Sequence, residues 1–451
     1  MNDELVQTDQ LQMLIQSKNV PQLRQLFDEY NIVDLAEAVN ELPIADIIFV
    51  FKTVTKDITG QLFSYLDNEV IEKLITVFNS DEIKIILNNL YSDDLFDFLQ
   101  ELPAPLAKKV LNSASAAQKK TINSLLSYQE DTAGSLMSTS YLELELTDTN
   151  AQAMLKIKKY GKKAETLGKC FVVDDNGILM GTVSLRDILF AKDETIINDI
   201  MDTDYIAVFT NTDNEDAAKT MQKYDENILA VTDNEQHMLG IITTDDVLDI
   251  LQEEATEDIH KMAAITPIEY PYMEASSFKI AMSRLVWLLL LMVSYALSSV
   301  IITNNNTLLV AVPSLITFIP MLMDTSGNAG SQASAMVIRG IIIDNLTIKD
   351  FFRVFLKEVS IAVICGLVLF IVNMLRIIIF VPSVGINMAL IVSTAVFFVV
   401  LLAKLTGGLF PLLALVIKMD PAVMAAPLIT TACDAISLLT YFALARLWLH
   451  L

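Results

Sequence analysis

The spacing of hydrophobic residues changes along the chain and predicts its organisation. In the first part, apolar residues recur at intervals of three and four, as in Leu35–Leu42 and Ile83–Leu90, which predicts short amphipathic helices. Two similar pieces, Asn40–Pro43 and Gln100–Pro103, each place a proline where a helix must end. This repetition predicts stacked helical hairpins, and we expect an acidic helical domain with a superhelical arrangement in residues 1–130.

Residues 131–251 follow a different pattern. Cys170–Gly177 predicts a strand that runs into a tight turn, Gly181–Ser184 predicts its partner strand, and a helix begins at Leu185. About sixty residues later the same order recurs from Ile228. An internal duplication of strand, turn, strand and helix predicts a tandem pair of α/β domains.

The last helix of this pair, which begins near Asp245, continues well beyond the duplication. It carries an apolar stripe: Leu248, Leu251, Ala255, Ile259 and Met262. Beside that stripe runs an acidic one: Asp246, Asp249, Glu253 and Glu257, flanked by Glu254 and Asp258. Thr266-Pro267 is expected to end the helix, so we assign residues 245–270 to an acidic connecting helix and link.

The remainder of the chain, residues 271–451, predicts a polytopic helical membrane domain. Five apolar segments are each long enough to cross about 30 Å of hydrocarbon, near residues 284–303, 307–339, 351–380, 386–416 and 421–449. We expect breaks in the second segment at Pro313, Pro320 and Gly327. In the fourth we expect breaks at Gly407-Gly408 and Pro411.

Charge supports this division. The chain holds 31 Lys and Arg against 55 Asp and Glu. Residues 284–451 contain nine basic and six acidic residues, which leaves 22 and 49 for residues 1–283. Such acidity excludes nucleic acid as a natural partner and favours divalent cations, although an acidic surface can also serve solubility alone. Three distant cysteines, Cys170, Cys365 and Cys433, indicate neither disulfides nor a zinc site.

The orientation follows from the flanking residues. The polar, acidic start MNDELVQTDQ lacks the features of a signal peptide. The expected outer loops, around 304–306 and 381–387, contain no Lys or Arg, whereas the inner flanks contain several. We therefore expect a multi-pass protein in the lipid bilayer of the cell membrane, with its N-terminal domains in the cytoplasm.

Asp434, in the last apolar segment, is the first candidate functional residue. A carboxylate at bilayer depth costs at least about 2.5–3.5 kcal/mol unless it is solvated or paired, so it indicates function by default. The alternative is a structural pair with an intramembrane base such as Lys404 or Arg376.

The segment Pro320–Gln332 is the second candidate. Its Gly, Asn and Gln residues suit backbone that bends beside a wet cavity, although small residues also permit close helix packing. Only oxygen ligands gather here, which favours Mg²⁺ or Ca²⁺, and Mg²⁺ keeps its water. One carboxylate per chain holding a hydrated ion suggests a symmetric dimer around a shared axis.

Residues 134–251 resemble a tandem pair of CBS domains. In that family a Ser/Thr-x-x-Asp motif binds a nucleotide ribose, and Ser184-Leu-Arg-Asp187 and Thr243-Thr-Asp-Asp246 match it. The resemblance implies a nucleotide site, with ATP as the candidate ligand, at Ser184, Arg186, Asp187, Thr243 and Asp246. Two observations weigh against it: such aspartates also cap helix N-termini, and no aromatic residue follows Asp225 to stack on a base.

Nearly the whole chain resembles the MgtE magnesium channel/transporter family. The most specific pieces are Gly327-Asn-Ala-Gly-x-Gln332 and the block from Asp420-Pro to Asp434. The resemblance implies a homodimer with its pore between the second and fifth spans. Asp434 would bind hydrated Mg²⁺, with Thr430 and Asn328 nearby.

The same resemblance implies feedback closure by cytoplasmic Mg²⁺. The helix near 245–263 matches the family's plug helix, and ions would bridge it to the N domain and CBS pair. The implied ligands are Asp93, Asp97, Asp213, Asp225, Asp246, Asp249, Glu254, Glu257 and Asp258, with Asp420 at the inner mouth of the last span. Without counter-ions these carboxylates repel one another. Ala263-Ala264 departs from the pattern, where a glycine is expected.

Other functions stay open at this point. Within transport, the cation could be Co²⁺, Mn²⁺ or Ca²⁺. From another class, the chain could be a membrane receptor that senses magnesium or a nucleotide without conducting, which would not need Asp434. An enzyme is not expected, because the sequence shows no nucleophile–base pair, metal cage or phosphate loop.

Overall fold

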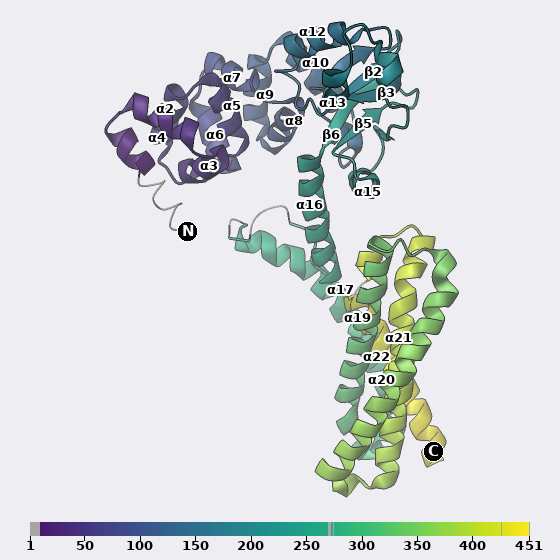
Figure 1. Ribbon diagram of the computed structural model, residues 1–451. Coiled ribbons are helices and arrows are strands. Elements are labelled where there is room, and N and C mark those ends of the chain that lie inside the picture. The colour runs from purple at the N-terminus through teal and green to yellow at the C-terminus, as the bar shows by residue number, and fades with distance from the viewer. Residues whose placement is uncertain (1–9, 269–271, 274, 425, 451) are drawn as a thin grey trace. The chain divides into compact units, whose positions relative to one another are not determined.

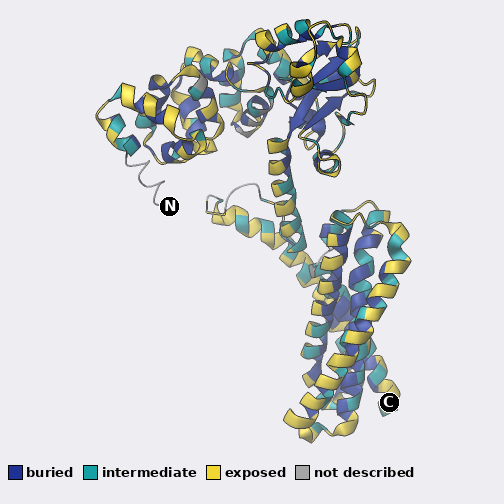
Figure 2. Ribbon diagram, viewed as in Figure 1, coloured by how far each residue is buried: buried dark blue, intermediate teal, exposed yellow. Residues whose placement is uncertain are grey.

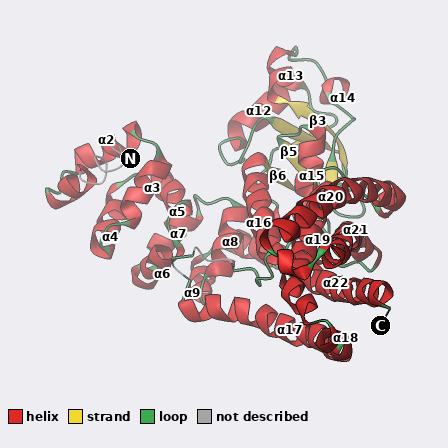
Figure 3. Cartoon of the chain, turned by 90° about the horizontal axis from the view of Figure 1, so that it is seen from below, coloured by secondary structure: helices red, strands yellow, loops and turns green. Residues whose placement is uncertain are grey.

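A computed structural model describes residues 10–268, 272–273, 275–424 and 426–450 (Figure 1). The chain divides into two compact units, Met1–Leu251 and Gln252–Leu451. Among the described residues, strands occur only in the second half of the first unit (Figure 3).

The N-terminal part of the first unit is built from short helices that share one hydrophobic core. Their bounds are α2 Val20–Glu29, α3 Ile32–Asn40, α4 Ile44–Thr53, α5 Lys56–Ser64, α6 Asn68–Val77, α7 Ser80–Leu87, α8 Ser92–Glu101, α9 Ala104–Ser113 and α10 Ala116–Leu125. Most helices pack on the one two places further along the chain, as α3 on α5, α5 on α7 and α7 on α9. The expected superhelix is confirmed. Pro43 and Pro103 stand at the N-caps of α4 and α9 and so separate consecutive helices.

The second part of this unit contains two three-stranded sheets with the order β1-β2-β3 and β4-β5-β6. The first repeat comprises α11 Ala133–Leu136, β1 Glu143–Glu145, α12 Asn150–Tyr160, β2 Lys169–Val173, β3 Leu179–Ser184 and α13 Leu185–Phe190. The second comprises α14 Ile197–Ile200, β4 Ala207–Phe209, α15 Asn214–Tyr224, β5 Ile228–Thr232, β6 Met238–Thr243 and α16 Thr244–Met262. In each sheet the first pair is parallel and the second antiparallel. The predicted duplication is confirmed.

The two sheets pack through a shared apolar cluster. Phe171 and Val173 of β2 meet Ile228 and Ala230 of β5 in this cluster, and all four side chains are buried. Alternation along each strand explains the arrangement, because the opposite side chains of β2 and β5 face the helices of their own repeat. The two repeats therefore form one α/β body.

The second unit is a helical bundle. It contains α17 Ser277–Asn304, α18 Asn306–Ala311, η1 Pro313–Phe318, α19 Ile319–Ile342, η2 Ile348–Asp350, α20 Phe351–Phe380, η3 Pro382–Val384, α21 Ile386–Val416, η4 Pro421–Met424 and α22 Ala426–Leu449. Four described helices, or helices with their adjoining turns, are long and apolar enough to cross a membrane: Ser277–Asn304, Ile348–Phe380, Ile386–Val416 and Pro427–Leu449. The fifth long helix, α19, is not among them, and the expected count of five spans stays a prediction.

Burial separates inner from outer helices in this bundle. In the most apolar 18-residue stretch of α17 and of α20, only 11 % and 17 % of the residues are buried. In the corresponding stretches of α21 and α22, 56 % and 50 % of the residues are buried. Figure 2 shows the exposed residues on the outside of the bundle and the buried ones within. Because the exposed residues of α17 and α20 are mostly large and apolar, these helices suit contact with lipid.

The helix break expected at Pro313 is confirmed, because η1 separates α18 from α19, but the other expected breaks are wrong. Pro320 lies at the first turn of α19, where proline is tolerated, and Gly327 lies inside an unbroken helix. Likewise α21 runs without a break through Gly407, Gly408 and Pro411. The backbone of the Pro320–Gln332 segment therefore does not bend away from helical geometry to expose free carbonyl groups.

The glycines serve close packing instead. A Cβ atom on Gly407 would lie 2.0 Å from the carbonyl oxygen of Gly330, and one on Gly330 would lie 2.5 Å from Cys433 Sγ. These distances are far shorter than ordinary contacts, so side chains are excluded where α19 meets α21 and α22. The alternative that small residues permit close approach therefore explains Gly330 and Gly407.

The connecting helix α16 ends close to the expected residue 263 and before Thr266-Pro267. It stops at Met262, and Ala264 takes the left-handed conformation with φ of 52°. The Ile265 N–H donates to His260 O at 2.9 Å and the Ala264 N–H to Lys261 O at 3.0 Å. This is a Schellman termination in which alanine occupies the position that favours glycine.

We expect Ala264→Gly to stabilise this helix end. The left-handed conformation costs a non-glycine residue about 1–2 kcal/mol, and glycine removes this strain. Glycine also loses more conformational entropy on folding than alanine does, so the expected net gain in stability is about 1 kcal/mol. Hydrogen exchange of peptides covering residues 260–266 should slow by about fivefold. Ala263→Gly, at a residue with ordinary negative φ, is the matched control and should speed exchange; slower exchange in both variants would contradict the assignment.

Candidate functional site

Asp434 is a buried carboxylate in α22. Its side chain is 5 % exposed, and its Oδ1 atom is buried with no hydrogen-bond partner among the residues that the structure describes. The groups of α19 that act on it are the Ser326 hydroxyl and the carboxylate of Asp324. A second acid nearby increases the need for positive charge rather than relieving it, so the site fits a cation or its hydration shell.

Among the described residues, Asp434 forms no structural pair with a base. Arg376 donates to Asn373 Oδ1 at 2.9 and 3.2 Å and contacts Met321 Sδ at 3.1 Å. Lys404 is buried and acts on Glu358 of α20. Within the described part of the chain, no ion pair joins Asp434 to either base, and its charge is not explained by a structural salt bridge.

The motif in α19 separates into two faces. Gly327, Ala329 and Gly330 are buried, whereas Asp324, Asn328 and Gln332 are exposed at four-residue spacing. This spacing places the three polar side chains on one stripe of the helix. A polar stripe near the middle of a helix in an otherwise apolar bundle cannot face hydrocarbon at low cost.

Thr430 lies where α22 meets α19. A Cβ atom on Gly327 would lie 2.9 Å from Thr430 Cγ2, and Thr430 Oγ1 is 3.4 Å from Ser331 Oγ. The expected neighbours of Asp434 therefore come from two packed helices, with Thr430 one turn before it and Asn328 on the exposed stripe of α19.

Asp420, just before η4, holds a lysine of the connecting helix. Lys261 Nζ lies 2.7 Å from Asp420 Oδ2 and 2.8 Å from Glu257 Oε1. Burial opposes the charge on Lys261, but hydrogen bonds to Asp420 and Glu257 outweigh it and raise the lysine pKa above its ordinary value. Sequence reasoning paired Asp420 with the acidic helix but missed this lysine, although Glu257 and Lys261 show the i, i+4 spacing of a helical ion pair.

A separate acidic group lies within the first unit. Asp94 of α8, Glu165, Asp245 and Asp246 act on one another electrostatically. Burial raises the pKa of Glu165 to about 7, and Asp246, Asp245 and Asp94 add to that shift. Burial also raises the pKa of Asp94 and Asp246. The expected ligands Asp93 and Asp97 belong to α8, but their side chains lie outside the described part of the structure.

Glu165 was missed from the sequence because it lies in the link between α12 and β2, far along the chain from Asp94. Its Oε2 atom is buried and has no hydrogen-bond partner in the described part of the chain. No local pattern brings these elements together; only the packing of the N-terminal helices on the α/β body does so. Among the described residues, no three His, Cys, Asp or Glu side chains converge closely enough to hold a metal ion directly.

The other expected sensor residues are spread along the chain. Asp213 caps α15 by accepting from the Glu215 N–H at 3.0 Å, and Asp225 ends the same helix with φ of 53°. Asp249 is exposed on α16, whereas Glu254 and Asp258 are half-buried there. Their role as Mg²⁺ ligands therefore stays a prediction.

Both Ser/Thr-x-x-Asp motifs cap helices. Ser184 accepts from the Asp187 N–H at 3.1 Å and donates to its Oδ2 at 2.6 Å. Asp246 accepts from the N–H and hydroxyl of Thr243 at 2.9 and 2.7 Å. Arg186 is exposed. The capping alternative thus accounts for these four residues, and nucleotide binding at them stays a prediction.

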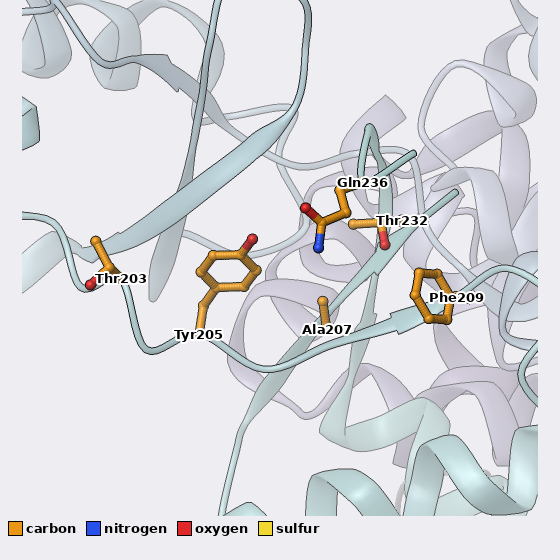
Figure 4. A pocket seen from close by; sticks show the side chains of 6 residues that line it. All are labelled: Thr203, Tyr205, Ala207, Phe209, Thr232 and Gln236. Atoms are coloured by element: carbon orange, nitrogen blue, oxygen red, sulfur yellow. The ribbon is translucent and has the colours of Figure 1, made fainter. Parts of the chain in front are cut away.

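One pocket of about 300 Å³ opens beside the second sheet. Thr203, Tyr205, Ala207, Phe209, Thr232 and Gln236 line it (Figure 4). The Tyr205 hydroxyl donates to Leu179 O at 2.8 Å, which fixes the ring. None of the residues expected to bind a nucleotide lines this pocket, so it does not support that assignment.

The fold and the buried acid define a membrane transport protein with an acidic, CBS-containing N-terminal part. Residues 319–444 match the divalent cation transporter model of the MgtE family, residues 30–131 match its intracellular N domain, and 133–194 and 197–253 match CBS domains. The chain is similar to the magnesium transporter MgtE of Thermus thermophilus, with 35 % identity over 70 % of this chain and 69 % of the relative. It is also similar to that of Bacillus subtilis, with 27 % identity over 90 % and 92 %.

A solved structure supports the same conclusion. The first unit resembles the cytosolic domain of the Mg²⁺ channel MgtE in complex with ATP, with a TM-score of 0.51 and 30 % identity over 54 % of this chain and 99 % of that one. The chain therefore belongs to the MgtE family of magnesium transporters. It is a membrane protein with a cytosolic N-terminal part, and the resemblance seen in the sequence is confirmed.

Proposed function

We propose that this chain conducts Mg²⁺ across the cell membrane through a pore on the axis of a homodimer. Asp434 is the observation that carries the proposal, because a buried intramembrane carboxylate oxygen that has no hydrogen-bond partner among the described residues suits a hydrated cation. Family membership supports Mg²⁺ as the ion, and hydrated Mg²⁺ suits a single carboxylate better than a full cage of ligands.

The polar stripe of α19 supports the dimer. Asp324, Asn328 and Gln332 are exposed on a single chain, although they lie in a helix expected to span the membrane. A second copy facing this stripe would enclose a polar conduit and remove these side chains from lipid. Asp434, Thr430 and Asn328 would then line the ion path, and α19 would be the second of five spans.

We further propose that cytoplasmic Mg²⁺ closes this pore. The self-repelling acids of the first unit, including Asp94, Glu165 and Asp246, form no ion pair with a base among the described residues, and a dication between them would relieve that repulsion. The bridging would include water, since three acidic ligands do not converge directly among the described side chains. ATP, Asp213, Asp225 and the acids of α16 remain part of this proposal as candidate modulators and ligands.

Mg²⁺ flux into proteoliposomes tests the function. The wild-type chain is expected to admit Mg²⁺ down its gradient, and flux should fall when Mg²⁺ on the side of the N-terminal domains reaches the millimolar range. Equal flux of Co²⁺, Mn²⁺ or Ca²⁺ would favour a general divalent transporter. Magnesium-dependent changes in the first unit without any flux would instead favour the non-conducting sensor.

A further inference from the structure

The contact between Lys261 and Asp420 joins the end of the connecting helix to the start of the last span. Both residues belong to the second unit. The lysine ammonium lies between Asp420 Oδ2 at 2.7 Å and Glu257 Oε1 at 2.8 Å. The other oxygen of Asp420 accepts from the Ala422 N–H at 2.8 Å. Asp420 is thus engaged on both oxygens, by a cation and by the backbone of η4.

The surrounding backbone holds the lysine in place. Lys261 lies in the last turn of α16, immediately before the Schellman termination at Ala264. Beyond that termination, the Thr266 N–H donates to Ser283 O of α17 at 3.1 Å. The Lys261 side chain is only 24 % exposed. These restraints limit how far the ammonium can move from the two carboxylates, unlike that of a free surface lysine.

We propose that Lys261 is a tethered cation that occupies the position between Glu257 and Asp420 and excludes Mg²⁺ from it. A dication bound to the same two carboxylates would lie within a few ångströms of the ammonium, and the two positive charges would repel each other. The end of the connecting helix is therefore attached to the last span without metal. This inference rests on the proposed closure by Mg²⁺, because it removes Glu257 and Asp420 from the set of metal ligands.

Attachment without metal has a consequence for gating. If one contact of the connecting helix persists in the absence of Mg²⁺, the ion controls only the remaining acidic contacts. Lys261 then sets how much of the closed arrangement survives at low Mg²⁺. Replacing the lysine by a neutral residue would leave two facing carboxylates, which repel each other until a dication binds between them.

Counting bound Mg²⁺ on the full-length, detergent-solubilised chain tests the proposal without requiring flux. By equilibrium dialysis, Asp420→Asn alone should leave the number of bound ions unchanged. Lys261→Gln should bind one further Mg²⁺ per chain, and Asp420→Asn added to Lys261→Gln should abolish that extra ion. Lys261→Arg should bind as many ions as wild type. Lys418→Gln, which removes an exposed lysine two residues from Asp420, is the matched control and should gain no ion.

Three results would overturn the proposal. Loss of an ion in Asp420→Asn alone would make Asp420 a native Mg²⁺ ligand, and this test stands even if Lys261→Gln fails to fold. A properly folded Lys261→Gln that gains no ion would show that the lysine excludes nothing. An extra bound ion in Lys418→Gln would show that the added binding depends on general surface charge rather than on the position of Lys261. Absence of flux in the wild-type chain would defeat the proposed function but would leave these ion counts unaffected.

Discussion

Replacing Asp434 by Asn should reduce Mg²⁺ flux into proteoliposomes at least about tenfold, the effect of losing about 1.4 kcal/mol of ion stabilisation. The carboxylate is buried in a helix apolar enough to cross a membrane, and its Oδ1 atom has no hydrogen-bond partner among the described residues. Asn keeps the shape of the side chain and removes its charge, so a loss of flux would be caused by the loss of the charge alone. Asp434→Glu should retain more flux than Asn, because it preserves the negative charge.

The control for this prediction is Asp344→Asn. Asp344 lies in the same unit, is exposed, and is 3.8 Å from Arg339, so its removal changes the charge of the domain without touching α22. Its flux should match wild type, since exposed ion pairs contribute little. Undiminished flux in Asp434→Asn, with protein correctly inserted, would remove Asp434 from the ion path.

The second large effect is expected from Gly407→Ala. The added Cβ atom would lie 2.0 Å from the backbone oxygen of Gly330, and neither backbone can rotate away as a side chain could. Helices α19 and α21 must then separate, at a cost of about 3 kcal/mol, the upper end of what an overpacked core typically costs. The half-aggregation temperature of the detergent-solubilised chain should fall by several degrees, and flux should fall with it because α19 carries the proposed pore stripe.

The neighbouring Gly408→Ala provides a matched comparison. Its Cβ atom would meet the Glu358 side chain, with the nearest atom, Cγ, at 2.8 Å. A side chain can shift by a few tenths of an ångström, so the effect should be clearly smaller than at Gly407. Equal losses in the two variants would mean that helix propensity, rather than the contact with Gly330, limits α21 at this point.

The sequence predicted the architecture well because its periodic patterns are local. Alternating and helical spacings, together with an internal duplication, were enough to identify the N-terminal helices, the two sheets and the long apolar helices. The glycines Gly327 and Gly407 led to the wrong expectation that their helices would break. Glycine permits both a bend and a close approach, and only the neighbouring helix determines which of them occurs.

The residues of the candidate site also fall into two groups, those that can be recognised in the sequence and those whose contacts form only in the folded chain. A carboxylate within an apolar segment is visible in the sequence, so Asp434 can be singled out from the order of residues alone. The contact of Lys261 with Asp420 cannot, because the two residues are 159 positions apart. The same holds for Glu165 and Asp94, because the carboxylate of Asp94 acts electrostatically on that of Glu165 only when separate helices and links pack together.

By itself, the sequence determined that this protein has an acidic cytosolic part, a duplicated α/β pair and a membrane domain with a charged residue inside it. These properties depend on composition and on spacing within a few turns or strands. Tertiary structure alone decided that Asp434 lacks a basic partner among the described residues, that the glycines of α19 and α21 bring backbones together, and that Lys261 neutralises Asp420. The reason is that burial, close approach and ion pairing are set by residues distant in the chain, whose distances no local pattern encodes.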